Sequence, residues 1–334
     1  MTMSVSDTPA AERSKFNFSD ALQRYGTLGI FIVLIVVATF WSDNFLSSRN
    51  IVNVLRQVAA GAGIMSVGML FVIITSGIDL SVGSIEALGS VLIAYFIAVS
   101  GFGTTGSVSL VILAGATCGL VTGAFVAYLR LAPFVMSLAM MAIARGLSLI
   151  ISNGQPIPLG PGGDLIAAFG TGFLPLGSFI LPWPVVLMFV IYAVAGVVLN
   201  FTRFGRIVKA IGSNEEAVRL SGIPVARYVM AVYVISGSLA AVAGIISSSR
   251  TTVGSSQVGV GMELSVIAAV VIGGASLMGG RGGVINTLIG AMIMGIIGNI
   301  MNLAGVPGYH QQVYTGLIII VAMLLQYGST ALRR

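Results

Sequence analysis

The chain has 334 residues, of which 57% are hydrophobic and 8% charged, and its net charge at pH 7 is +6. One water-soluble core cannot bury so many apolar side chains, so we expect the lipid bilayer to be the solvent. The only cysteine, Cys118, excludes a disulfide or a thiolate metal site within one chain. The only histidine, His310, argues against a histidine-ligated metal or a histidine-based triad. We therefore expect no catalytic residue, no metal and no cofactor.

In chain order, the apolar runs predict about ten membrane-crossing helices, because a crossing needs roughly 20 apolar residues. The sequence thus predicts an all-α integral membrane protein. Its first apolar run lacks a small-residue cleavage pattern, which favours a retained span over a signal peptide. We expect a tail over residues 1–26, a transmembrane domain over 27–328 and a second tail over 329–334. The crossings are expected near residues 27–43, 51–76, 82–99, 107–128, 132–152, 182–199, 228–248, 263–278, 283–303 and 313–327.

The distribution of basic residues predicts the orientation of the chain. An even number of crossings puts both termini on one side, which would also hold the basic segment between Arg203 and Arg227. Lysine and arginine mark the cytoplasmic side, so both tails are expected there, and orientation explains the positive charge better than nucleic-acid binding does. The opposite loop over 153–181 contains no lysine or arginine and is rich in glycine and proline. It predicts either an irregular cap on an external mouth or a plain connector.

Two short motifs indicate an internal repeat. Residues 77–82 read GIDLSV and residues 261–266 read GMELSV. Five predicted crossings separate them, so the second copy enters the membrane in the opposite direction. We expect repeat one over about 51–152 and repeat two over about 228–327, joined by a loop over 200–227. Inverted repeats are a recurring construction of transporters, although channels use them too.

Three acidic residues lie at or inside the predicted apolar zone. An unpaired carboxylate at the membrane midplane costs about 2.5–3.5 kcal/mol, so each needs a partner or a cavity. Asp79 and Glu263 occupy equivalent places in the two motifs, which favours helix caps at the repeat junction over functional groups. For Glu86 the structural and functional interpretations stay equally open.

Polar residues on the predicted spans are candidates for a translocation pathway. Neutral amides both donate and accept hydrogen bonds, which suits sugar hydroxyls better than an ion, but each could instead join two helices. Arg145 could equally be paired with a buried acid or carbonyl. A glycine stripe at every fourth position predicts close helix packing, with a dimer contact as the less favoured use. The pathway candidates are Asn53, Gln57, Glu86, Arg145, Asn299, Asn302 and Gln312, and the stripe is Gly115, Gly119 and Gly123.

The segment over 203–227 concentrates charge in an otherwise apolar chain. Asn214 is a predicted N-cap for a short helix with Glu215 and Glu216 in its first turn, Arg219 near its end and Gly222 after it. Such a cytoplasmic knob predicts either a docking element or a solvated linker. The chain contains no G-x-x-x-x-G-K-[ST] phosphate-binding loop, which favours docking to a separate motor.

Five segments taken together resemble the membrane permease subunits of ABC importers, specifically the ribose/galactose/arabinose class. They are SGIDLSVGSI (76–85), FVMSLAMMAIARGLSLIISNGQPI (134–157), FGRIVKAIGSNEEAVRLSGIPV (204–225), VIGGASLMGGRGG (271–283) and QQVYTGLIIIVA (311–322). The short permease pattern E-A-A-x-x-x-G is present from Glu216 to Gly222 with valine at its third position.

The resemblance implies a non-enzymatic transport subunit in a bacterial inner membrane. Glu215, Glu216, Arg219 and Gly222 would belong to a coupling helix that sits in a cleft of the ATPase. The implied partners are a cytoplasmic ABC ATPase, possibly tandem, a periplasmic sugar-binding protein and a second permease copy, besides membrane lipid. A permease for a nucleoside, an autoinducer or a branched-chain amino acid is the near alternative. A secondary carrier or channel is the alternative from another class, and an intramembrane hydrolase ranks last.

Overall fold

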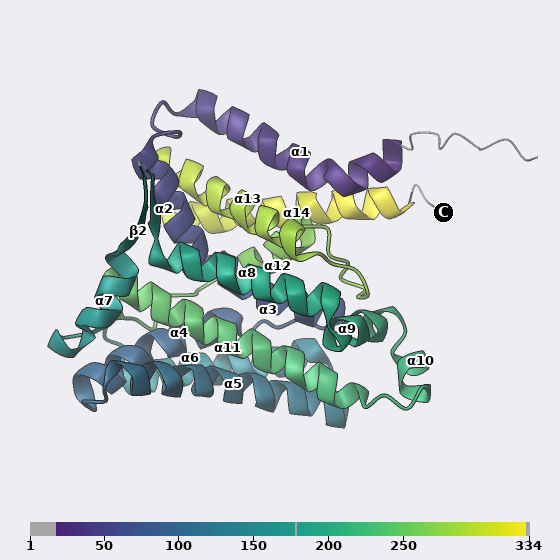
Figure 1. The fold of residues 1–334 in the computed structure, drawn as a ribbon, viewed down its shortest axis with the longest axis horizontal. Coiled ribbons are helices and arrows are strands. Elements are labelled where there is room, and N and C mark those ends of the chain that lie inside the picture. The colour runs from purple at the N-terminus through teal and green to yellow at the C-terminus, as the bar shows by residue number, and fades with distance from the viewer. Residues whose placement is uncertain (1–17, 178, 332–334) are drawn as a thin grey trace, which may run out of the picture.

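The computed structural model describes residues 18–177 and 179–331. Its long helices lie roughly along one axis of the molecule (Figure 1). The helices are α1 (Phe18–Trp41), α2 (Ser48–Val58), η1 (Ala59–Gly63), α3 (Ile64–Ile74), α4 (Val82–Ala94), η2 (Tyr95–Val99), α5 (Thr104–Leu129), α6 (Pro133–Ser152), η3 (Pro161–Gly163), α7 (Asp164–Thr171), α8 (Trp183–Phe201), α9 (Arg203–Ser213), α10 (Glu215–Leu220), α11 (Val225–Thr251), α12 (Met262–Ile272), α13 (Val284–Leu303) and α14 (Gly308–Ala331). Four short strands form two antiparallel pairs: β1 (Ile157–Pro158) with β4 (Val253–Gly254), and β2 (Phe173–Leu176) with β3 (Phe179–Pro182).

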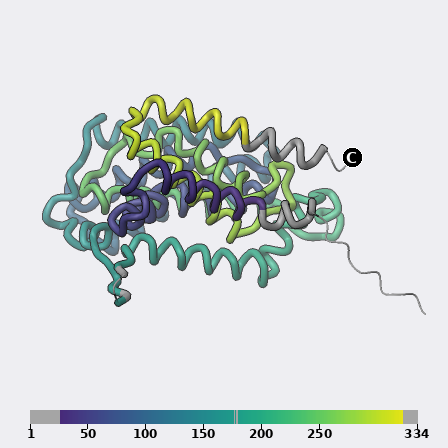
Figure 2. The backbone as a smooth tube through the Cα atoms, turned by 90° about the horizontal axis from the view of Figure 1, so that it is seen from above, coloured from purple at the N-terminus to yellow at the C-terminus, as the bar shows by residue number. Residues whose placement is uncertain are grey.

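The two ends of the helix bundle differ. We call one the α10 end, where α9 and α10 lie, and the other the α7 end, where α7 and the β2–β3 hairpin lie (Figure 1). Helix α1 begins and α14 finishes near the α10 end. Figure 2 shows α8 along one edge of the bundle and α14 along the opposite edge, with α1 between them in that view.

The core consists of α3 and α4 packed against α11. Every residue of α3 and of α4 is buried. By contrast, α5, α6 and α8 carry exposed apolar side chains, including Phe134, Ile150 and Phe201. Each helix satisfies its own backbone hydrogen bonds, so apolar side chains can face lipid without cost. This arrangement fits a bundle whose outer helices meet a bilayer.

Of the described residues, seven helical segments are long and apolar enough to cross a membrane. Each of the ten predicted crossings coincides with a helical segment, but three of those segments do not meet this measure. They are α1, whose apolar part is Gly26–Trp41, the short helix α12, and α14. The structure therefore supports an all-α membrane protein, while the number ten stays a prediction.

The second predicted crossing is a broken helix. Helix α2 and helix α3 are joined by the π-helix η1, in which Gly61 has non-helical dihedral angles (φ −117°, ψ −120°). A π-helical turn interrupts the regular hydrogen-bond ladder and is one of the recognised causes of a kink. The sequence shows only a continuous apolar run here, because the break lies in the small residues AAGAG.

The region over 153–181 is more regular than expected. It contains η3, α7 and the β2–β3 hairpin. It also contains β1, which pairs with β4, the strand that follows α11 in the chain. Gly170 makes this possible, since a Cβ there would collide with the backbone of Ser249 on α11. The sequence left an irregular cap and a plain connector open; the structure has a short helix, α7, packed directly on α11.

The predicted tails also differ from expectation in part. Helix α1 begins at Phe18, so residues 18–26 are helical where a tail was expected, and α14 continues to Ala331. The Thr27 hydroxyl on α1 donates a hydrogen bond to the carbonyl oxygen of Ile272 on α12 (3.0 Å) and so joins the two helices. The remaining tail residues, 1–17 and 332–334, lie outside the described part of the chain, together with the basic residues Arg13, Lys15, Arg333 and Arg334.

The glycine stripe lies against α11. A Cβ at Gly115 would overlap the carbonyl oxygen of Gly237, and one at Gly119 would overlap that of Tyr233. At Gly123 a Cβ would lie 3.0 Å from the backbone of Met230. All three glycines thus permit backbone-to-backbone approach of α5 and α11, and none is left free for a contact between two copies of the chain.

Candidate functional site

The two repeat motifs meet at one point in the bundle, which we call the junction. Helix α4 follows the first motif, and α12 begins within the second. A Cβ at Gly83 would collide with the carbonyl oxygen of Gly259, and a Cβ at Gly259 would collide with that of Gly83. The two backbones are therefore in direct contact where the two helices start.

From the junction, α4 and α12 run in opposite directions. Helix α4 runs toward the α7 end, where the Ser90 hydroxyl accepts a hydrogen bond from the Ser255 N–H (3.0 Å). Helix α12 runs toward the α10 end, and the loop after it donates from the Gly280 N–H to the carbonyl of Ile74 (2.9 Å). Helix α4 continues through η2 as far as Val99, whereas α12 is among the shorter apolar helices.

Asp79 is fully hydrogen-bonded just before α4. Its Oδ1 accepts from the N–H (3.0 Å) and the hydroxyl (2.5 Å) of Ser81, and its Oδ2 accepts from the Ser236 hydroxyl on α11 (2.7 Å). Only 1% of the residue is exposed. The carboxylate therefore stabilises the turn that precedes α4 and links that turn to α11.

Glu86 is buried with one oxygen satisfied. Ser247 donates to Oε1 (2.8 Å), whereas Oε2 has no hydrogen-bond partner within the described residues. A Cβ built at Gly259 would lie 3.0 Å from Oε2, which places that oxygen beside the junction. From the other half, Glu263 in the first turn of α12 lies against Gly83, with Oε2 2.7 Å from a Cβ built there.

Arg145 reaches the same junction from α6. Its guanidinium donates to the carbonyls of Ser256 and Val258 (2.9 Å to the latter) and more weakly to that of Gly83 (3.4 Å). It also interacts electrostatically with both Glu86 and Glu263. The structure thus pairs Arg145 with carbonyls, and its positive charge offsets two nearby carboxylates.

A polar cavity of about 300 Å³ adjoins this cluster near the α7 end. Three elements supply most of its lining: α2, α7 and the last turns of α11. Two lining residues bond the buried cluster: the Ser247 hydroxyl donates to Glu86, and the Val258 carbonyl accepts from Arg145. The lining residues are Asn53, Arg56, Gly170, Thr171, Ser247, Arg250, Thr251 and Val258.

Three of the predicted pathway residues are therefore brought together. Asn53 lines the cavity directly, while Glu86 and Arg145 contact its lining residues. Sequence reasoning missed Arg56, Ser247 and Arg250. A signal for them exists, because Asn53/Arg56 and Ser247/Arg250 are each spaced i,i+3 and so share a helix face.

The other predicted pathway residues lie elsewhere. Asn299 exchanges two side-chain hydrogen bonds with Asn50 (2.8 and 3.0 Å), which joins α13 to α2. Asn302 accepts from Gln311 (2.8 Å), and Gln312 is exposed on α14. Gln57 lies beside Gly298 on α13. None of the four predicted here, Gln57, Asn299, Asn302 and Gln312, lines the polar cavity.

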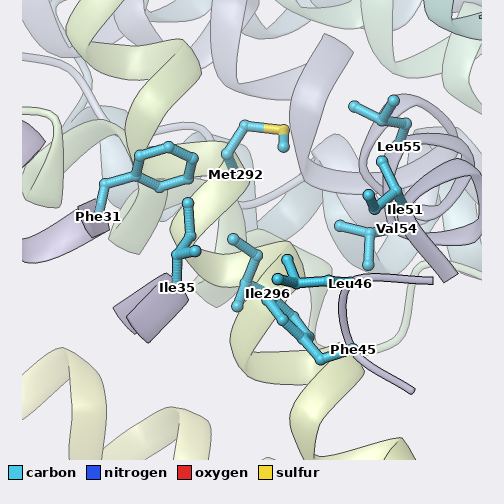
Figure 3. A pocket seen from close by; sticks show the side chains of 9 residues that line it. All are labelled: Phe31, Ile35, Phe45, Leu46, Ile51, Val54, Leu55, Met292 and Ile296. Carbon is cyan, nitrogen blue, oxygen red and sulfur yellow. The ribbon is translucent and has the colours of Figure 1, made fainter. Parts of the chain in front are cut away.

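A second cavity, of about 210 Å³, is lined only by apolar side chains and lies between α1, α2 and α13 (Figure 3). Phe31 and Ile35 approach it from α1, Met292 and Ile296 from α13. It offers no donor or acceptor from a side chain, so it provides no chemistry for a polar solute.

The charged segment forms a compact knob at the α10 end. The predicted cap is confirmed, since Asn214 Oδ1 accepts from the N–H of Ala217 (3.0 Å). Arg219 makes ion pairs with Glu215 (3.8 Å) and Glu216 on the exposed face of α10. Gly222 follows with φ +79° and open space around it.

The base of the knob is tied to the core. A Cβ at Gly212 on α9 would collide with the carbonyl oxygen of Ile74, the last residue of α3, and with the backbone of Gly280. A small apolar cluster of Ile211, Val218 and Val225 joins α9, α10 and α11. The knob is therefore joined through α9 to α3 and to the loop after α12.

Comparison with known proteins agrees with this architecture. Residues 50–323 match the model of the family described as "Branched-chain amino acid transport system / permease component". The chain belongs to this permease family. The match covers the junction, the polar cavity and the knob in a single stretch.

Individual relatives cover nearly the whole chain. The ribose import permease protein of Escherichia coli K12 is 42% identical over 88% of this chain and 90% of its own length. That of Bacillus subtilis 168 is 41% identical over 96% and 98%. The L-arabinose transport system permease protein of Escherichia coli K12 is 37% identical over 94% and 93%. No solved structure shows a significant match to this chain.

Proposed function

We propose that this chain is the membrane permease subunit of an ATP-driven importer and forms the passage for a monosaccharide. The observation that carries the proposal is the similarity, over nearly the full length of both chains, to permeases named for ribose and L-arabinose. A permease for a nucleoside, an autoinducer or a branched-chain amino acid is less well supported, because these three relatives are named for pentoses instead.

The energy would enter through α10. The 334 residues contain no phosphate-binding loop, so the work must come from a separate ATPase, and the knob is an exposed charged element fixed to the core at Gly212. Nucleotide binding in that partner would favour one of two bundle arrangements, and α9 and α10 would transmit the bias as a rigid lever. The contact residues would be Glu215, Glu216, Arg219 and Gly222.

The topology supports alternating access. Helices α4 and α12 start at the junction and run in opposite directions, as expected for inverted repeats with about ten crossings. The α10 end, with both tails, would face the cytoplasm of a bacterium, and the α7 end would receive sugar from a periplasmic binding protein. A second permease copy would complete the passage.

The polar cavity would be the outer part of the passage, and the junction its barrier. The Asn53 amide offers sugar hydroxyls both a donor and an acceptor. The hydroxyls of Ser247 and Thr251 donate to Glu86 and to main-chain carbonyls, so they offer acceptors. Inward passage then requires α4 and α12 to separate where Gly83 meets Gly259. In this arrangement Glu86, Glu263 and Arg145 stabilise the closed junction, and Asp79 has a structural role in the turn before α4.

Reconstitution in proteoliposomes tests the proposal. We expect uptake of D-ribose or L-arabinose only when the vesicles contain this chain together with its ATPase, ATP and the sugar-binding protein. A secondary carrier predicts the opposite pattern, namely uptake by this chain alone that follows a pH gradient and ignores ATP. Uphill uptake without any ATPase would therefore disprove the proposal.

Replacement of Arg145 is expected to slow transport. The change Arg145→Ala removes the donors to Ser256, Val258 and Gly83 and leaves two carboxylates without a nearby cation. Charge-assisted hydrogen bonds contribute about 1.5–3 kcal/mol, so uptake should fall about tenfold or more. Arg145→Lys should restore part of the rate because it keeps the charge.

Arg130→Gln is the matched control, since Arg130 is exposed at the end of α5. Initial uptake rate and melting temperature should be measured for all three variants. Normal uptake by Arg145→Ala at wild-type melting temperature would contradict a role for Arg145 at the junction.

A further inference from the structure

Two arginines line the polar cavity, and among the described residues no acidic residue lines it with them. Arg56 comes from α2 and Arg250 from the last turn of α11. They are close enough to repel each other electrostatically. Within the described residues, the only ion pairs are those of Arg219 in the knob, so neither cavity arginine is neutralised.

Arg56 is held in place but not satisfied. Its Nη2 donates to the carbonyl of Thr171 (2.8 Å), and its guanidinium lies 4.4 Å from the centre of the Phe173 ring. The Nε atom is buried and has no hydrogen-bond partner among the described residues. Contacts to Thr171 and Phe173 fix the position of the group, and a donor is left over.

Arg250 has even fewer contacts. No hydrogen bond or ion pair involves its guanidinium in the part of the chain that the structure describes. The residue is half-buried at the end of α11, beside Thr251 and Ser247. Its donors are therefore available to whatever enters the cavity.

A pair of uncompensated guanidinium groups is costly in this place. Like charges in a partly buried, low-dielectric site repel, and each arginine loses hydration there. Within the described part of the chain no carboxylate lines the cavity, and Glu86, which contacts its lining through Ser247, is already bonded to that hydroxyl. A neutral sugar would not offset this cost, because it carries no negative charge to compensate the two guanidinium groups.

We propose that the cavity binds the anionic group, carboxylate or phosphate, of a sugar-sized solute, with Arg56 and Arg250 as its two cationic contacts. Guanidinium groups bind both anions through paired N–H donors, which gives geometry as well as strength. A volume of about 300 Å³ accommodates a single sugar ring. The inference rests on the proposed function and adds sugars that carry an acidic group to its substrate class.

Equilibrium binding to the purified full-length chain in phosphatidylcholine nanodiscs tests this inference. The probes are radiolabelled D-galacturonate and D-galactose, which differ only in the carboxylate, with D-ribose 5-phosphate as the phosphate probe. We expect an anionic probe to bind about tenfold or more tightly than D-galactose. Arg250→Gln and Arg56→Gln should each remove most of that preference.

Arg49→Gln is the matched control, since Arg49 is exposed on the same helix as Arg56 and does not line the cavity. The melting temperature of each variant distinguishes loss of an anion contact from loss of folding. If Arg56→Gln disturbs the β2–β3 hairpin, which Arg56 contacts at Phe173, Arg250→Gln alone tests the inference. Equal affinity for all probes, or an equal loss in Arg49→Gln, would overturn the inference.

A lipid headgroup is the other possible source of the anion. Repeating the measurement in nanodiscs that contain phosphatidylglycerol distinguishes the two. Unchanged binding of the anionic probe supports a solute site. Displacement of the probe by phosphatidylglycerol would overturn the inference, because the site would then belong to lipid.

Failure of this inference can be told apart from failure of the proposed function. The binding assay needs no ATPase, whereas the reconstitution above does. ATP-driven uptake of a neutral sugar, without any preference for D-galacturonate or D-ribose 5-phosphate in the binding assay, would reject only the anion site. Tight binding of an anionic probe, without ATP-driven uptake of any solute, would reject only the importer.

Discussion

Glu216→Arg is expected to abolish sugar uptake while the protein still inserts and folds. Glu216 lies on the exposed face of α10 and contacts Arg219, so its charge is not needed by the membrane core. If α10 sits in a cleft of an ATPase, reversing this charge places like charges together and costs about 2–5 kcal/mol of contact free energy. Uptake should fall at least about tenfold, and stimulation of ATP hydrolysis should be lost with it.

A second substitution tests the same contact by shape. Gly222→Trp adds bulk in open space, at a backbone angle (φ +79°) that side chains rarely adopt. We expect the same uncoupling, with little change in the seven long apolar helices. Because strain could also unwind the end of α10, circular dichroism and melting temperature should accompany the ATPase and uptake assays.

Asp43→Arg is the matched control for the charge reversal. Asp43 is an exposed acid in the loop after α1, far along the chain from the knob. Its reversal should leave coupling intact. Wild-type uptake by both Glu216→Arg and Gly222→Trp would show that α10 is only a linker.

Gly119→Ala is expected to have the largest effect on stability. A Cβ at this position would overlap the carbonyl oxygen of Tyr233, and that oxygen belongs to the backbone of α11 and cannot swing away. Forcing extra atoms into a close-packed contact costs about 1–3 kcal/mol, and here it would push α5 from α11 along the whole glycine stripe. The melting temperature in detergent should drop by several degrees or more.

Gly196→Ala is the comparison that isolates this contact. Gly196 is also in the middle of a long helix, α8, but a Cβ there meets nothing within 4 Å. Alanine is the better helix former by about 1 kcal/mol, so this variant should be as stable as wild type or slightly more stable. An equal loss of stability in both variants would mean that glycine flexibility, rather than the α5–α11 contact, explains the effect.

Local patterns in the sequence predicted the elements of the fold. Each apolar run became helical, and Asn214 caps α10 as its side chain and position indicated. These features depend on residues close together in the chain: burial of apolar side chains in lipid, and a cap three residues from its donor. The spacing of the glycine stripe likewise indicated a close helix contact, although it could not name α11 as the partner.

The site was harder to predict, because its contacts join residues far apart in the chain. Glu86 accepts a hydrogen bond from Ser247, and Arg145 donates one to Val258. In each case the sequence offers other residues with the same hydrogen-bonding groups as possible partners. Asn299 illustrates the ambiguity. Its side-chain amide suits a pathway residue, yet that amide makes two hydrogen bonds with Asn50 on α2.

By itself the sequence determined that this protein needs a bilayer, that a short motif recurs at 77–82 and 261–266, and that the chain carries a charged knob. The reason is that hydropathy, repetition and capping are local properties. Only the tertiary structure decided that α4 and α12 meet at Gly83 and Gly259, and that Arg56 and Arg250 share one cavity. Those arrangements depend on how closely two backbones can approach, and that distance is set by packing across the whole bundle.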